Sequence, residues 1–177
     1  THYNDGSEIP NITNNDDWNG LSTGAYGDYD NNPTNSETYG RLYNWYTVDD
    51  SRGVCPEGWH VPSGDEWTML TDYLGGTSVA GGKMKSTGTI EDGDGLWYSP
   101  NTGATNSSGF TARPAGYRDA GSGSFVGLGT IATWWVNNEY NVSNSWGRTL
   151  HHNAATVSRP YNNKEHGVSI RCVKGNS

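Results

Sequence analysis

The chain has 177 residues, enough for one domain of ordinary size, and we take residues 1–177 as a single domain. Aromatic residues make up 12% against 17% charged residues, which argues against a disordered chain, and the net charge of −8 argues against nucleic-acid binding, because that binding rests on Lys and Arg at phosphates. No run approaches the roughly 20 apolar residues of a membrane span, so we expect no span. Residues 1–6 lack the basic and apolar regions of a signal peptide, so we expect any export signal to be already absent from this sequence.

Turn-forming residues dominate the first 37 positions. We expect four spaced side chains to hold this stretch on a core: Trp18, Leu21, Tyr26 and Tyr29. Residues 39–48 form the first dense apolar segment. Their spacing suits a helix and their Tyr and Trp content suits a strand, so the type of this element stays open.

The clearest local signal predicts a helix over residues 64–74. Ser63 can cap its N-terminus while Glu66 returns a hydrogen bond to the amide of the cap residue. Three side chains then share one face of the helix: Trp67, Leu70 and Leu74. Gly75 and Gly76 supply a left-handed stop.

A shorter helix is predicted to follow, capped by Thr77 or Ser78 and running to Met84. Gly81 and Gly82 weaken this prediction, because glycine disfavours a helix interior.

From about residue 95 the chain consists of short apolar pieces separated by Gly, Asn and Ser. Residues 168–173 alternate strictly between apolar and polar, which predicts a strand with one buried face. Helices early and short strands late indicate an α+β fold with short antiparallel sheets, two helices and long loops.

Cys55 and Cys172 are the two cysteines of the chain. A bridge between them would stabilise the fold by about 4–5 kcal/mol in the chain-entropy description. The polar, Asn- and Gly-rich composition suits an extracellular protein and favours the bridge. The alternative is two buried free thiols in a reducing cell.

The sequence gives little support for a metal site or for enzymatic activity. His151 and His152 are adjacent, so on a strand they point to opposite faces and cannot chelate one ion side by side. Calcium is the alternative, with oxygen ligands from one of two acidic groups that lack the EF-hand spacing: Asp28, Asp30 and Asn31, or Glu91, Asp92 and Asp94. No catalytic triad order or nucleophile motif occurs, so we expect no enzymatic activity and no cofactor.

Ordered sequence blocks carry a resemblance that spans residues 3–174. They are residues 39–46, 55–63, 66–67, 74–76, 80–85, 106–110, 115–119 and 169–174. This set resembles the Fibrobacter succinogenes major paralogous domain family, which is abundant in bacterial secreted and surface proteins. The blocks at 59–67 and 169–173 are also similar to landmarks of the formylglycine-generating-enzyme-like group, and residues 55–59 to C-type lectin domains.

The resemblance implies a C-type-lectin-like fold whose chain ends meet in a small sheet and whose long loops present a ligand site. A bridge from Cys55 to the last strand would suit that geometry. The Glu-Pro-Asn and Trp-Asn-Asp patterns of calcium-dependent sugar binding are missing, so that activity is not implied.

The chain departs from the family pattern between residues 147 and 161. Nine residues stand where relatives commonly have Asn: Gly147, His151, His152, Ala154, Ala155, Thr156, Ser158, Pro160 and Tyr161. Each is reachable from an Asn codon by changing adenines only. This pattern is similar to that of a variable protein of a diversity-generating retroelement; ordinary drift is the alternative.

The sequence therefore predicts a ligand- or receptor-binding surface domain with its site in residues 134–166. Tyr, Trp, Ser, Gly and Asn, the residue types of antibody loops, are concentrated there. We expect Trp134, Trp146 and Leu150 in the core and Trp135 at the surface. The predicted contact residues are Trp135, Asn137, Asn138, Gly147, His151, His152, Asn153, Ala155, Ser158, Pro160, Tyr161, Glu165 and His166.

The expected partner is a protein or glycan on another surface, met outside a cell or on a virion. The alternative function is a structural or adhesive module of secreted or cell-surface proteins without a diversified site.

Overall fold

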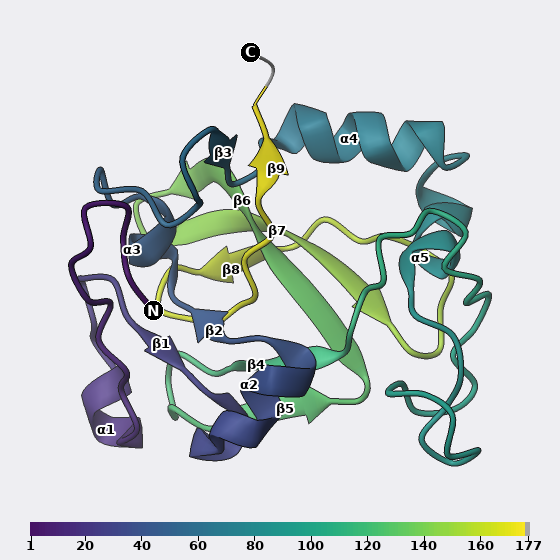
Figure 1. Cartoon of the computed structure of the whole chain (residues 1–177), viewed down its shortest axis with the longest axis horizontal. Helices are drawn as coiled ribbons and strands as arrows, with labels where there is room; N and C mark the ends of the chain where they lie inside the picture. Colours follow the sequence, from purple (N-terminus) through teal and green to yellow (C-terminus); the bar gives the residue numbers. More distant parts are fainter. Residues whose placement is uncertain (176–177) are drawn as a thin grey trace.

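Short helices and strands precede one larger sheet in the computed structural model, which describes residues 1–175 (Figure 1). The first part of the chain contains α1 (Asn15–Trp18), β1 (Tyr26–Gly27), a 3₁₀ helix (Tyr29–Asn31), α2 (Pro33–Tyr39), β2 (Leu42–Tyr43), α3 (Trp45–Val48), β3 (Trp59–His60), α4 (Gly64–Tyr73) and α5 (Thr77–Met84). The later part contains β4 (Ala115–Arg118), β5 (Phe125–Leu128), β6 (Ile131–Asn141), β7 (Asn144–His151), β8 (Tyr161–Asn163) and β9 (Val173–Lys174). The α+β prediction is confirmed, but residues 1–175 form five α-helices rather than two, and one strand pair of the main sheet is parallel. The open segment 39–48 contains both a strand and a helix.

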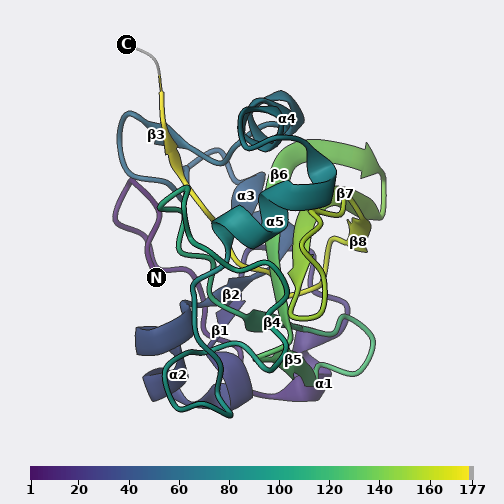
Figure 2. The same ribbon diagram turned by 90° about the vertical axis from the view of Figure 1, so that its right-hand side faces the viewer.

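Five strands form the main sheet in the order β5-β4-β6-β7-β8. β6 and β7 make an antiparallel hairpin, while β4 pairs with β6 in parallel. In Figure 2 the strands β6, β7 and β8 lie on one side of the molecule and α2 lies on the other. No helix among the described residues is long and apolar enough to cross a membrane.

Consecutive tryptophans bury both faces of β6. Trp134 packs with Trp67, Met84 and Leu150 in the largest apolar cluster. Trp135 points to the opposite face, packs with Trp45 and Val168, and donates a hydrogen bond from Nε1 to the Tyr43 carbonyl oxygen at 2.7 Å. The prediction that Trp135 lies at the surface is wrong, because α3 and the segment at Val168 cover this second face.

The predicted helix is confirmed in α4, which ends one residue earlier than expected. Ser63 is its N-cap, and the reciprocal bonds of a capping box join Ser63 and Glu66. Gly75 and Gly76 both have positive φ after the last turn. Trp67 and Leu74 are buried.

The second helix also forms, with its N-cap at Gly76 rather than at Thr77 or Ser78. Its glycines are required by packing. A Cβ at Gly81 would lie 2.4 Å from the Thr156 carbonyl oxygen, and one at Gly82 would lie 2.3 Å from the Gly103 carbonyl oxygen. Close contact with two neighbouring backbones thus outweighs the low helix propensity of glycine.

The C-terminal segment differs from the predicted strand over 168–173. Single bridges join Val168 to Tyr43 and Ser169 to Trp134, and the regular strand β9 begins only at Val173. Ser169 is buried although it occupies a polar position, because the segment lies against β6.

The expectation that the chain ends meet in one small sheet is wrong. β9 pairs antiparallel with β3, whereas β1 near the N-terminus pairs with β2.

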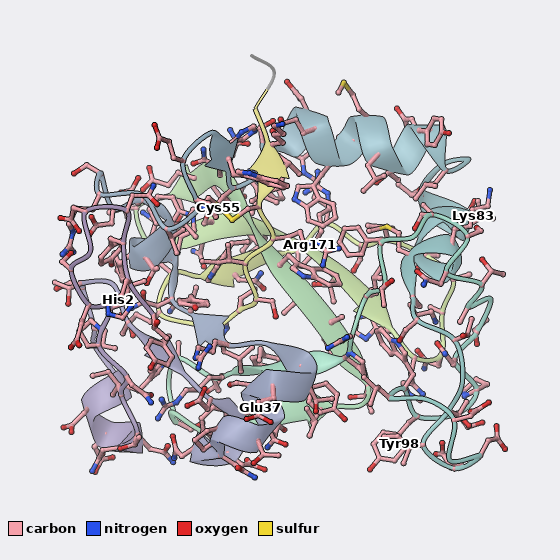
Figure 3. All side chains as sticks on the ribbon, viewed as in Figure 1. His2, Glu37, Cys55, Lys83, Tyr98 and Arg171 are labelled. Carbon is pink, nitrogen blue, oxygen red and sulfur yellow. A yellow bond between two sulfur atoms is a disulfide. The ribbon has the colours of Figure 1, made fainter. Side chains whose placement is uncertain are left out.

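A disulfide joins Cys55 to Cys172 across 117 residues, with the Cα atoms 5.8 Å apart. Figure 3 places Cys55 beside the pair formed by β3 and β9. The predicted bridge is confirmed, and it fastens the C-terminal segment to the loop before β3.

Removing this bridge should lower the free energy of unfolding by about 4–5 kcal/mol, because the unfolded chain regains the entropy of a long closed loop. Urea unfolding of the wild type and of the double variant Cys55→Ser/Cys172→Ser measures the loss. A reductant should lower the free energy of unfolding of the wild type and leave that of the double variant unchanged. Equal stability of both proteins without reductant would contradict this assignment.

Candidate binding surface

A groove of about 260 Å³ lies along the Trp135 face of the β6–β7 hairpin. It is lined by Tyr117, Ile131, Thr133, Thr149, His151, Ser158, Pro160, Asn162, His166 and Val168. Four of these are predicted contact residues: His151, Ser158, Pro160 and His166. The structure therefore brings part of the predicted set together around one concave surface.

Hydrogen bonds fix the base and one side of this groove. The Thr133 and Thr149 hydroxyl groups lie 2.8 Å apart across β6 and β7. Ser158 forms two backbone hydrogen bonds with Thr149, of 2.9 and 3.0 Å, and its hydroxyl donates to the Thr149 carbonyl oxygen at 3.1 Å. The Ser158 segment thus continues the sheet beyond β7.

Gly147 lies beneath the groove lining rather than on the surface. It is buried opposite Trp135, and a Cβ there would lie 2.4 Å from Nδ2 of Asn162. The prediction of Gly147 as a contact residue is wrong, because Asn162 covers it. Within residues 1–175 this Nδ2 atom is buried without a hydrogen-bond partner.

Both histidines of the groove favour the neutral form. Burial lowers the pKa of His166, with Asp119 and Glu165 opposing the shift, and Nδ1 of its ring accepts the Ala120 amide proton at 2.8 Å. Burial also lowers the pKa of His151, and His152 adds to the shift. The groove therefore presents neutral polar imidazoles near neutral pH.

An exposed aromatic ledge lies on the opposite face of the sheet edge. Tyr140 and Tyr161 are 47% and 57% exposed, and their rings stack with centroids 4.7 Å apart. Trp146 packs edge-on against Tyr140 at 4.8 Å, and the Arg159 guanidinium lies 4.3 Å from the Trp146 ring centroid. We call Tyr140, Trp146, Arg159 and Tyr161 the aromatic ledge. Trp146 is half-buried against the main apolar cluster, as well as part of this ledge.

β8 separates the groove from the ledge. Tyr161 pairs with Trp146 and shares its face, whereas the side chain of the next residue, Asn162, lines the groove. One short edge strand therefore places its side chains on two distinct surfaces.

The remaining predicted contact residues lie elsewhere. Asn138 accepts the Gly64 amide proton at 2.7 Å, and its neighbour Asn137 lines a separate small pocket beside Cys55. His152 contacts the Ser99 carbonyl oxygen through Nδ1 at 2.8 Å.

Three further members of the predicted set lie outside the groove lining. Asn153 is exposed. The carbonyl oxygen of Ala155 accepts the Gly82 amide proton at 3.0 Å, and that of Glu165 accepts Nε1 of Trp18 at 2.8 Å. Ala155 and Glu165 therefore have packing and anchoring roles.

The sequence profile of the Fibrobacter succinogenes major domain (Fib_succ_major) matches residues 1–174. The chain belongs to this family. No curated protein and no solved structure matches it.

Within residues 1–175 of this family member, no group of three or more His, Cys, Asp or Glu residues is arranged to hold a metal ion. In the second acidic group, Asp92 accepts the Thr89 hydroxyl proton at 2.6 Å and Asp94 accepts the Thr89 amide proton at 2.9 Å. In the first group, Asp28 accepts from the Ser36 hydroxyl and lies 3.4 Å from Nε of Arg41. These carboxylates hold turns and α2 in place.

Sequence reasoning missed three prominent residues of this surface: Tyr117, Tyr140 and Asn162. Tyr140 precedes the nine substituted positions, and Asn162 follows them. Strand alternation was the available signal for Asn162, because Tyr161 and its neighbour on one strand must face opposite sides. Tyr117 joins the groove only through the pairing of β4 with β6.

Acidification should destabilise this domain through the groove histidines. Unfolded histidines take up protons near their ordinary pKa of about 6.5, whereas His166 in the fold resists protonation, so the free energy of unfolding falls as pH drops through and below that value. Urea unfolding at pH 7.5 and 5.5 measures the fall.

His166→Asn offers an oxygen in place of Nδ1 and removes the titration, so it should reduce the pH dependence. His2→Asn, at an exposed position, is the matched control and should retain the wild-type slope. If the free energy of unfolding of His166→Asn falls between pH 7.5 and 5.5 as much as that of the wild type, His166 does not cause the destabilisation by acid.

Proposed function

We propose that this domain is a non-enzymatic ligand-binding module that recognises its partner with the groove and the aromatic ledge. The main support for this proposal is the exposed stack of Tyr140 and Tyr161. Tyr161 lies on the edge strand β8, and the other face of that strand contributes Asn162 to the groove. A protein or a glycan on another surface is the proposed partner.

The ledge suits recognition because its rings are large and already ordered. Stacking with Tyr140, and the edge-on contact of Trp146, restrict the Tyr161 ring before any ligand arrives. Little side-chain entropy is then lost on binding, and Tyr and Trp supply contact area together with polar tips.

We further propose that the exposed positions form a variable face of the kind rewritten by a diversity-generating retroelement. Support comes from Thr156, Ser158 and Tyr161, which are exposed, and from His151 and Pro160, which are half-buried in the groove lining. Substitutions at these positions leave the buried Trp residues of β6 untouched. Gly147 is an exception among the nine, because Asn162 packs against it.

A C-type-lectin-like fold and an extracellular location belong to the same proposal. The disulfide from the loop before β3 to the C-terminal segment supports the extracellular location, since such bridges persist in oxidising compartments. The long connections between α5 and β4 are also consistent with a lectin-like domain.

Arrays of glycans and of surface proteins test the proposed function directly. The wild type should bind a defined subset, and Tyr140→Ser/Tyr161→Ser should lose that binding by at least about tenfold, as expected for truncated aromatic anchors. Met69→Ser/Tyr73→Ser is the matched control, because it removes two apolar side chains, 67% and 88% exposed, from the outer face of α4.

Equal loss in both double variants, or no change in either, would overturn the assignment of the surface. Absence of array binding together with concentration-dependent self-association in light scattering would favour the structural module instead.

A further inference from the structure

A cleft of about 510 Å³ lies on the Trp134 face of β6, away from the groove. It is bounded by α2, the loop at 109–113 and the segment at 169–171. In Figure 3, Arg171 lies between α4 and α2, and Glu37 lies on α2. Its volume is in the range of small-molecule sites in proteins.

Three of the eleven Lys and Arg residues of this acidic chain line the cleft: Arg41, Arg113 and Arg171. Glu37 is the only acidic residue in the lining. Arg41 lies 3.4 Å from the Asp28 carboxylate, which balances its charge. Within residues 1–175, Arg113 and Arg171 form no ion pair.

The two unbalanced guanidinium groups are held in place by the backbone. Arg113 donates from Nη1 to the Thr38 carbonyl oxygen. Arg171 donates from Nη2 to the Phe110 carbonyl oxygen at 2.7 Å and lies 4.3 Å from the Phe110 ring centroid. Each keeps its other N–H donors without a partner among the described residues.

These two cations also repel each other. Partial burial lowers the pKa of Arg171, and the charge of Arg113 lowers it further. Because Arg stays protonated, this repulsion persists in the free protein. An anion placed between the two groups would relieve it and would accept paired hydrogen bonds from their planar forks.

We propose that this cleft binds an acidic sugar unit, whose carboxylate or sulfate lies between Arg113 and Arg171. The rest of the lining fits a hydroxylated ligand, because it adds the hydroxyl-bearing residues Ser36, Thr111 and Ser169 and the phenol rings of Tyr39 and Tyr43. A simple inorganic anion would use the guanidinium groups alone.

The cleft shares no lining residue with the groove, and no residue of the aromatic ledge lines it. Trp134 and Ser169 line the cleft, whereas their neighbours Thr133 and Val168 line the groove. Successive residues of an extended chain point to opposite sides, so the two sites lie on opposite faces of β6.

Calorimetric titration and thermal unfolding of the whole chain test the cleft with defined probes. A galacturonate trisaccharide or a sulfated disaccharide should bind saturably and raise Tm, and the tighter of the two identifies the oxyanion. A neutral galactose trisaccharide should not bind. Affinity should fall with added salt.

Arg113→Gln should weaken the acidic sugar at least about tenfold while leaving Tm of the free protein unchanged or slightly raised, because it removes the repulsion. Arg159→Gln, on the ledge, is the matched control and should bind like the wild type. Folding of Arg113→Gln is checked by that Tm, so lost binding is separable from lost structure.

Four outcomes would overturn the proposal: no saturable binding of either acidic sugar, unchanged affinity in Arg113→Gln, inorganic sulfate binding as tightly as the sugars, or a Glu-rich peptide binding more tightly than both. Because Tyr140→Ser/Tyr161→Ser leaves the cleft intact, it should retain acidic-sugar binding whether or not the array experiment succeeds.

Discussion

The burial of Trp134 and Trp135 on opposite faces of one strand is the constraint on which the rest of the structure depends. Trp134 anchors the cluster beneath α4 and α5, and Trp135 anchors the cluster with Trp45 and Val168. Truncating a buried Trp typically costs about 3–5 kcal/mol. Packing therefore holds β6 on both faces, and backbone pairing with β6 fixes the positions of β4 and β7.

This central strand explains how a loop-rich chain can present ordered surfaces. β7 pairs with β6 over most of its length, and the Ser158 segment and β8 pair in turn with β7. The groove lies across β6, β7 and the Ser158 segment, and the ledge lies at β7 and the edge strand β8, where several side chains remain exposed. On the Trp134 face, Ser169 and Arg171 follow the same strand into the acidic-sugar cleft. The fold thus sets the candidate contact residues on a buried framework, to which Trp134 and Trp146 also belong.

The sequence predicted local structure better than surface placement. The capping box of Ser63 and Glu66 and the glycine stop after α4 involve neighbouring residues, so their chemistry could be read directly. Trp135 could not be placed this way, because its burial depends on α3 and on the segment at Val168, both far away in sequence. Strand parity correctly put Trp134 and Trp135 on opposite faces but could not show that both faces are covered.

The candidate site was predicted in part for the same reason. Four predicted contact residues line one groove, as expected if they belong to a single site: His151, Ser158, Pro160 and His166. Asn138 and Glu165 have the same polar character, but their partners are backbone groups of Gly64 and Gly20. Composition identifies side chains suited to contact. Only the fold decides which of them are already engaged.

Randomising four exposed or groove positions together tests the central claim most directly: His151, Ser158, Pro160 and Tyr161. A displayed library would be selected for protease resistance, beside a library of equal size at Trp134, Trp135, Val136 and Leu150. If the buried residues of β6 stabilise the fold and the surface positions accept substitution, most members of the first library should resist protease. Nearly all members of the second library should be cleaved. Similar survival in the two libraries would contradict the account.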